Sequence, residues 1–319
     1  MRARSEQTRA VISDTSATID RQRTREGLIS ALVSYSLWGC LPIYFKLVES
    51  VPATEVLVHR VIWAVPFGFV IVLARRQWPE VIRALRTRSV LGLLTLAAVV
   101  LAVNWLVYIW AVQNEMIFQG SLGYYINPLL YVLVGVVFFG ERLRRLQTGA
   151  VLLAAAGVAV LTISGGEFPL IALTLATTFT IYGTIRSRVA IGGMPGLFVE
   201  TIVLFPAACA WLLWLAIRYT AVFGSGEWGM SGLLMLAGPL TVLPLLFFAL
   251  AARRLSLSAI GFMQFIAPTL QFLVGVAYGE ALTGPHIVCF ALIWTAVILF
   301  SADAWRRSRA VVMPGRQAI

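Results

Sequence analysis

Long apolar runs constrain the fold of this chain more than any other feature of its sequence. Each run has about 20 residues, the length that a helix needs to cross the hydrocarbon core of a membrane. The runs do not alternate apolar with polar residues, so they are unlike the short strands of a membrane barrel. Ten spans are predicted, at residues 27–48, 56–74, 90–112, 118–139, 146–164, 168–186, 197–218, 230–251, 258–278 and 284–303.

The composition agrees with a chain that is nearly all membrane helix. Apolar residues make up 60% of the 319 residues, charged residues only 12%, and the mean hydropathy is +0.87. Ordinary soluble proteins are about 45–50% apolar and about 25% charged. The sequence therefore excludes a soluble enzyme, a disordered chain and a disulfide scaffold, and we expect an all-α integral membrane protein.

The positive charges alternate from loop to loop. All but three of the 25 Lys and Arg residues fall in the two tails and in the loops after spans 2, 4, 6 and 8. The exceptions are Lys46, Arg60 and Arg218. Because cytoplasmic loops carry an excess of Lys and Arg, both termini are predicted to be cytoplasmic. The net charge of +11 is thus attributed to membrane topology, and no nucleic-acid partner is expected.

The chain resembles itself at a shift of about 140 residues. SLGYYINPLLYVLVGVVFFGERL (121–143) aligns with SAIGFMQFIAPTLQFLVGVAYGEAL (258–282), and Trp38-Gly39 aligns with Tyr182-Gly183. The segment from Arg60 to Pro66 likewise aligns with the segment from Glu200 to Pro206. Each half holds five spans, an odd number, so the second half is predicted to enter the membrane inverted, as in many transporters.

The predicted organisation follows from the repeat. A disordered cytoplasmic tail is expected at 1–26, the first five-helix repeat at 27–164, the second at 168–303, and a short cytoplasmic tail at 304–319.

Several segments resemble the EamA family of the drug/metabolite transporter superfamily, and in particular its RarD-type members. They include YSLWGCLPIYFK (35–46), NWLVYIWAV (104–112), FTIYGTIRSR (179–188) and GFMQFIAPTLQFLVG (261–275). The resemblance implies ten helices in two inverted repeats in the bacterial inner membrane. It also implies export of small metabolites or drugs, including chloramphenicol-like compounds.

Polar and aromatic residues recur at helical spacing within the spans and predict a binding cavity. Polar residues inside spans tend to face the interior of the bundle. Rings and amides together suit an aromatic or amphipathic solute, whereas the alternative is that these side chains only hold helices together. The candidates are Trp38, Asn104, Tyr108, Tyr124, Asn127, Tyr131, Gln264 and Gln271.

Four ionisable residues are candidates for attracting the solute or coupling its movement to a proton. Lys46 and Arg60 are predicted to form an electropositive outer vestibule for carboxylate-bearing solutes, unless they only extend toward the membrane surface. His59 and Glu200 are candidates for proton coupling, with a structural, hydrogen-bonded role as the alternative for His59. Glu141 and Glu280, which follow spans 4 and 9, are expected to anchor helix ends or to pair with loop arginines.

Prolines within the spans are candidate kink or gate positions, because a proline leaves backbone groups free to rearrange. They are Pro42, Pro66, Pro128, Pro206 and Pro268.

Taken together, these features predict a secondary carrier that works by alternating access. No ATP-binding domain is expected, because a Walker A motif requires Gly-Lys-Ser/Thr and Lys46 is the only lysine. The two histidines show no catalytic spacing, so no enzymatic activity, metal or cofactor is expected. The remaining alternative is a membrane receptor or assembly factor that transports nothing.

Overall fold

The computed structural model describes residues 22–140, 145–165, 168–255 and 257–312, and this part of the chain is helical without a strand. Helical residues 22–39 form the first helix. The other helices are α2 (Leu41–Leu47), α3 (Ala53–Ala74), α4 (Trp78–Arg86), α5 (Arg88–Gln113), α6 (Ile117–Phe139), α7 (Arg145–Gly165), α8 (Leu170–Ser187), α9 (Gly193–Ile217), α10 (Trp228–Ala252), α11 (Leu257–Met263), α12 (Ile266–Ala277) and α13 (Gly284–Val312).

The expected membrane character is confirmed in its coarse form. Eight helical segments of the described chain are long and apolar enough to cross a membrane, beginning with Gln22–Leu47. Helices also lie at the other two predicted spans, α8 and the apolar part of α13 (Gly284–Leu299), but these two do not meet the same criterion. A count of ten spans and the inversion of the halves therefore stay predictions.

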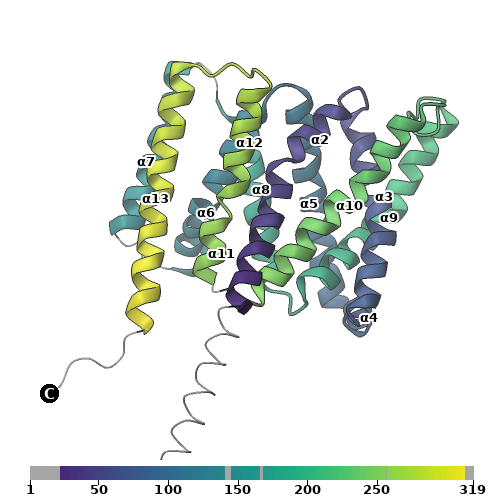
Figure 1. Cartoon of the computed structure of the whole chain (residues 1–319), viewed down its shortest axis with the longest axis horizontal. Coiled ribbons are helices and arrows are strands. Elements are labelled where there is room, and N and C mark those ends of the chain that lie inside the picture. Colours follow the sequence, from purple (N-terminus) through teal and green to yellow (C-terminus); the bar gives the residue numbers. More distant parts are fainter. Residues whose placement is uncertain (1–21, 141–144, 166–167, 256, 313–319) are drawn as a thin grey trace, which may run out of the picture.

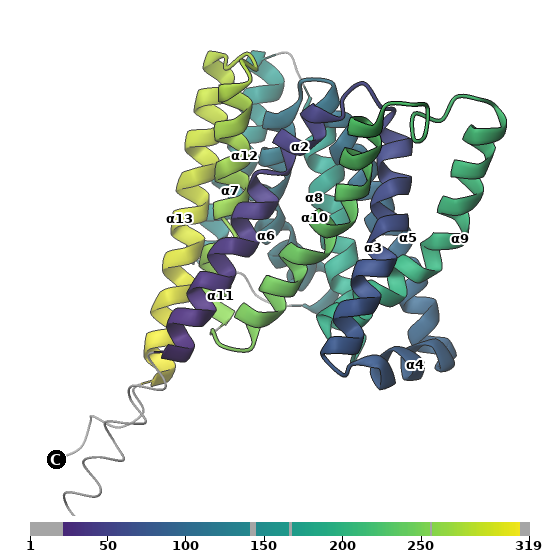
Figure 2. The same cartoon turned by 45° about the vertical axis from the view of Figure 1, so that its right-hand side comes forward.

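The helices stand side by side across the molecule. In Figures 1 and 2, α7 and α13 pack together at one side, and α3, α9 and α10 form the other side. In Figure 1, the first helix, α5, α6, α8 and α12 lie between these two groups. This central group holds most of the segments in which the sequence predicted cavity residues.

Several boundaries differ from the prediction. Residues 22–26, expected in the disordered tail, already belong to the first helix, and α13 continues past 303 to Val312. The predicted loop after span 2 contains α4, a short helix whose Val81 and Ala84 are buried while its charged side chains lie on the other face. Residues 1–21, 313–319 and Glu141 lie outside the described residues.

Two spans are broken where a proline removes a backbone donor. The first helix is interrupted at Cys40, two residues before Pro42, and the ninth span is interrupted at residues 264–265, shortly before Pro268. A proline has no N–H to donate to the carbonyl four residues earlier. Pro42 therefore leaves the Trp38 carbonyl without its helical donor, and Pro268 leaves the Gln264 carbonyl without its own. By contrast, Pro66, Pro128 and Pro206 lie inside continuous helices.

Arginine-bearing segments gather at one end of the bundle. The start of the first helix, α4 and the end of α13 lie at this end (Figures 1 and 2). Arg254 at the end of α10 pairs with Glu26 at 3.3 Å, which ties the loop after span 8 to the start of the chain's first helix. These segments, which the charge pattern assigned to one side of the membrane, therefore lie at one end of the bundle.

A carboxylate from the second half anchors the start of α6 at the opposite end. Both carboxylate oxygens of Glu280 accept the backbone N–H of Phe118 at 3.0 Å. Phe118 lies in the first turn of α6, where backbone N–H groups lack partners within the helix. Burial raises the pKa of the Glu280 carboxyl from 4.5 to about 7, against the opposing effect of the Phe118 N–H.

Replacing Glu280 tests this contact. We expect Glu280→Ala to lower the free energy of unfolding by about 1 kcal/mol, the usual cost of losing a helix cap, whereas Glu280→Gln keeps an acceptor. Because the folded-state pKa is raised, the carboxyl contributes stability below pH 4.5 that is lost as the pH rises through about 7. The midpoint temperature of thermal unfolding should therefore fall less steeply between pH 5 and 8 in Glu280→Gln than in the native protein. Parallel plots of that temperature against pH would contradict this role.

Candidate functional site

A cavity of about 410 Å³ opens in the central group of helices. Its walls come from both halves of the chain: the first helix, α2, α3, α5 and α6 from one, and α8, α9, α10 and α12 from the other. None of its described lining residues belongs to α7 or α13. A space of this size fits a small organic molecule.

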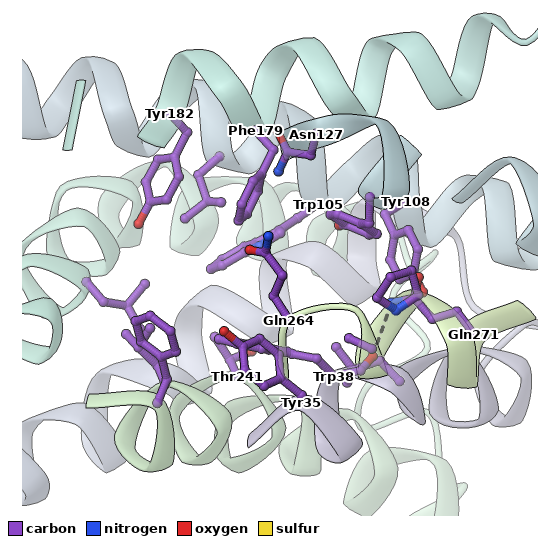
Figure 3. A pocket seen from close by; sticks show the side chains of 18 of the residues that line it. Tyr35, Trp38, Trp105, Tyr108, Asn127, Phe179, Tyr182, Thr241, Gln264 and Gln271 are labelled. Carbon is purple, nitrogen blue, oxygen red and sulfur yellow. Dashed lines mark hydrogen bonds between the residues drawn. The ribbon is translucent and has the colours of Figure 1, made fainter. Parts of the chain in front are cut away.

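Most of the predicted binding residues line this cavity. Figure 3 shows Gln264 projecting between two rows of side chains, one with Phe179 and Tyr182 and the other with Tyr35 and Trp38. Gln264 lies at the break between α11 and α12. The lining residues that the sequence singled out are Trp38, Tyr108, Tyr124, Asn127, Tyr131, Gln264 and Gln271. That they bind a solute stays a prediction.

Asn104 does not line the cavity and has a structural position instead. Its side chain is fully buried, and its amide nitrogen donates to the carbonyl of Leu175 at 3.0 Å and to the hydroxyl of Thr178 at 2.8 Å. Its amide oxygen accepts the hydroxyl of Tyr124 at 3.4 Å. Asn104 thus joins α5 to α8 and orients a cavity tyrosine, which is the helix-joining alternative for a polar residue in a span.

Aromatic rings form two connected walls. The rings of Tyr108 and Tyr124 lie 5.5 Å apart, and Phe179 continues this wall at 5.8 Å from Tyr124. On the other side, Trp38 lies 5.7 Å from Tyr35 and 6.0 Å from Phe248. Rings held in this way present a rigid apolar surface with polar edges, which suits a flat or amphipathic molecule.

Arg60 brings a positive charge to the cavity wall. It is the eighth residue of α3, it is only 5% exposed, and its Nε donates to the hydroxyl of Thr241 on α10 at 2.8 Å. Its guanidinium carbon lies 4.0 Å from the centre of the Trp105 ring, within the range of a cation–π interaction. The structure therefore places Arg60 at the cavity rather than at the membrane surface.

A second cation, Arg186, also lines the cavity, but it has an acidic partner. Arg186 Nε lies 3.3 Å from Oε1 of the buried Glu200, and the hydroxyl of Tyr182 donates to Glu200 Oε2 at 3.3 Å. Glu200, a predicted coupling residue, is therefore connected to the cavity through two of its lining residues. Proton coupling at Glu200 stays a prediction.

Neither Lys46 nor His59 is among the described residues that line the cavity. Lys46 pairs with Glu49 at 3.1 Å, whereas Arg60 lines the cavity. The two cations therefore do not form the single vestibule that the sequence predicted. His59 accepts the indole N–H of Trp63 at its Nδ1 at 3.1 Å and packs on Phe223 with ring centres 4.7 Å apart. These contacts match the structural alternative for His59, and Lys46 has no place in the cavity.

Four important lining residues were missed by sequence reasoning: Trp105, Tyr182, Arg186 and Thr241. The internal repeat contained a signal for Tyr182, since it aligns with Trp38, which was singled out. Arg186 was assigned to a cytoplasmic loop by its charge, although it belongs to the last turn of α8. No group of three or more His, Cys, Asp or Glu side chains in the described chain is arranged to hold a metal.

Comparison with known proteins identifies several relatives. Residues 25–163 match the EamA-like transporter family. Protein RarD of Salmonella typhi is 45% identical over 287 residues, which cover 90% of this chain and 98% of the relative. The chloramphenicol-sensitive protein RarD of Pseudomonas aeruginosa is 33% identical over 290 residues, covering 89% of this chain and 96% of that protein.

One solved crystal structure shares the fold. It superimposes with a TM-score of 0.56 at 20% sequence identity, and covers 87% of this chain and 98% of its own.

The broken first helix offers a test of the cavity's architecture. Gln271 Nε2 donates at 3.3 Å to the Trp38 carbonyl, the group that Pro42 leaves without a donor. We expect Gln271→Met to lower the free energy of unfolding by about 1 kcal/mol, because a partly buried carbonyl loses its partner.

Pro42→Ala restores the missing N–H, so the same Gln271→Met change should cost clearly less in that background. Thermal unfolding of the four proteins in detergent gives the coupling between the two positions. Strictly additive effects would show that Gln271 does not compensate for the proline.

Proposed function

This chain belongs to the EamA-like transporter family as one of its RarD-type members, and we propose that it is a secondary carrier exporting a small organic solute across the bacterial inner membrane. The observation that carries the proposal is the central cavity, which is walled by helices from both halves and lined by aromatic rings. Such a cavity between repeats is where transporters of this architecture bind their solutes.

Related contacts in the two halves support an inverted-repeat mechanism. Gly39 follows the cavity residue Trp38 and packs against Leu270 of α12, whereas Gly183 follows Tyr182 and packs against Tyr131 of α6. An added Cβ at Gly39 would meet the Cβ of Leu270, close to the backbone of α12, whereas one at Gly183 would meet only the outer end of the Tyr131 side chain. The repeat alignment pairs Gly39 with Gly183 and α6 with α12, so corresponding glycines of the two halves face corresponding helices.

The proposed movement is a rocking of the two halves about this cavity. The breaks at Cys40 and at residues 264–265 lie beside the lining residues Trp38 and Gln264. Broken helices at the binding site are a common feature of carriers, because the interrupted backbone can rearrange without losing a whole helix. Pro42 and Pro268 are therefore our preferred gate positions among the five predicted prolines.

The proposed topology follows from the Arg-rich end of the bundle. By the positive-inside rule this end faces the cytoplasm, which places both termini there. Export toward the opposite side is inferred from the family resemblance. The proposed solutes are aromatic or amphipathic metabolites and chloramphenicol-like compounds, the latter because a relative's name describes it as chloramphenicol-sensitive.

Flux measured in sealed proteoliposomes tests the proposal. The solutes would be aromatic amino acids, purine-like metabolites and chloramphenicol, each with and without an imposed pH gradient. We expect saturable flux of at least one solute. Trp38→Ala should reduce that flux about fivefold at low solute concentration, since loss of ring contacts costs about 1 kcal/mol.

Trp211→Ala provides the matched control. Trp211 is 41% exposed and does not line the cavity, so the flux should stay within about twofold of the native value. Equal losses in both variants would contradict a binding role for the cavity, and no flux of any solute would favour a receptor instead.

A further inference from the structure

Arg60 is a buried cation whose hydrogen-bonding capacity is mostly unused. An arginine side chain carries five N–H donors, and one of these, at Nε, is taken by Thr241. Within the described chain, no carboxylate lies within ion-pair distance of Arg60, although four other such pairs form. Its remaining donors therefore have no protein partner of opposite charge, and the side chain lines the cavity.

The neighbours of Arg60 hold its guanidinium in one orientation. The Thr241 hydroxyl donates to the Ala237 carbonyl at 2.8 Å, which leaves its lone pairs to accept from Arg60 Nε. The Trp105 ring, 4.0 Å away, covers one side of the group, and the Phe45 ring lies at 5.9 Å. A guanidinium fixed in this way is preorganised for a ligand, so little ordering is required on binding.

The charges at the cavity do not cancel. Arg186 is balanced by Glu200, whereas Arg60 has no counterpart, so these three side chains sum to a single positive charge. Lys46 adds nothing, because it pairs with Glu49 away from the lining residues. An unpaired charge inside a membrane span is costly, and one negative charge on a ligand would neutralise it.

We infer that the cavity binds a monoanionic aromatic carboxylate, and that the guanidinium of Arg60 anchors its carboxylate group. Arginine matches a carboxylate with two parallel hydrogen bonds, and the aromatic walls accept the rest of the molecule. Two buried polar atoms of lining residues, Tyr108 Oη and Gln271 Oε1, have no hydrogen-bond partner among the described residues and can meet further polar groups of the ligand. This inference deepens the proposed function and rests on it.

Equilibrium binding to the purified full-length protein in detergent tests the anchor without requiring transport. The probes are benzoate, phenylacetate and indole-3-acetate, each compared by calorimetry with its neutral primary amide. At least one carboxylate should bind about tenfold more tightly than its amide. Arg60→Gln should weaken carboxylate binding by about 30-fold or more, the usual effect of removing one partner of a buried charge pair, and change amide binding little.

Two further variants control for folding and for general charge. Arg60→Lys keeps the charge without the paired donors, so it should retain part of the preference for carboxylates even if Arg60→Gln does not fold. Arg218→Gln removes a cation at the end of α9, outside the cavity, and should bind as the native protein does. Equal affinity for acids and amides, no binding of any carboxylate, or an unchanged preference in Arg60→Gln would overturn the anchor.

Flux of the same pairs in proteoliposomes separates this inference from the proposed function. Carboxylate flux that exceeds amide flux and depends on Arg60 supports both. Equal flux of acids and amides would contradict the carboxylate-binding role of Arg60 but support transport. Arg60-dependent carboxylate binding without any flux would contradict transport but support that binding role.

Discussion

Polar groups inside a membrane must find partners within the protein, and this constraint shapes the whole molecule. Helices satisfy it for most of the backbone, since each N–H beyond the first turn meets a carbonyl of the same segment. Where Pro42 breaks that pattern, the side chain of Gln271 from the other half of the chain supplies the missing donor to Trp38. The cavity therefore lies where the backbone is irregular and where the two halves depend on each other for hydrogen bonds.

The same constraint separates structural polar residues from those available to a ligand. Asn104 and Glu280 use their polar atoms within the protein, and both join helices that are distant in sequence. Arg186 and Glu200 neutralise each other beside the cavity. Arg60 is different, because a threonine and a tryptophan hold it in place without balancing its charge. The position of unsatisfied charge, more than the shape of the cavity, thus indicates what the protein binds.

Hydropathy predicted the helical elements well, because the length of an apolar run is a local property that the membrane dictates. The helical spacing of polar and aromatic residues predicted that Trp38 and Gln264 would line a cavity, and both do. Side-chain partners were less predictable, since Asn104 and Asn127 look alike in sequence and only their contacts across helices distinguish them. Charge alone was misleading for Lys46 and Arg186. Lys46 is paired by the nearby Glu49, and Arg186 lines the cavity although its charge suggested a loop, because an arginine in the last turn of a span can face either side.

If the protein works by alternating access, one cavity opens to both sides of the membrane in turn, and labelling of a single cysteine measures this. Gln264→Cys would be introduced after replacing Cys40, Cys209 and Cys289, and a membrane-impermeant maleimide would be applied to right-side-out and to inverted vesicles. We expect labelling from both sides, reduced by a bound solute. A cysteine at Leu152, on the exposed surface of the apolar span α7, should not be labelled because the lipid bilayer excludes the reagent there. Labelling of Gln264→Cys from one side alone under every condition would contradict alternating access.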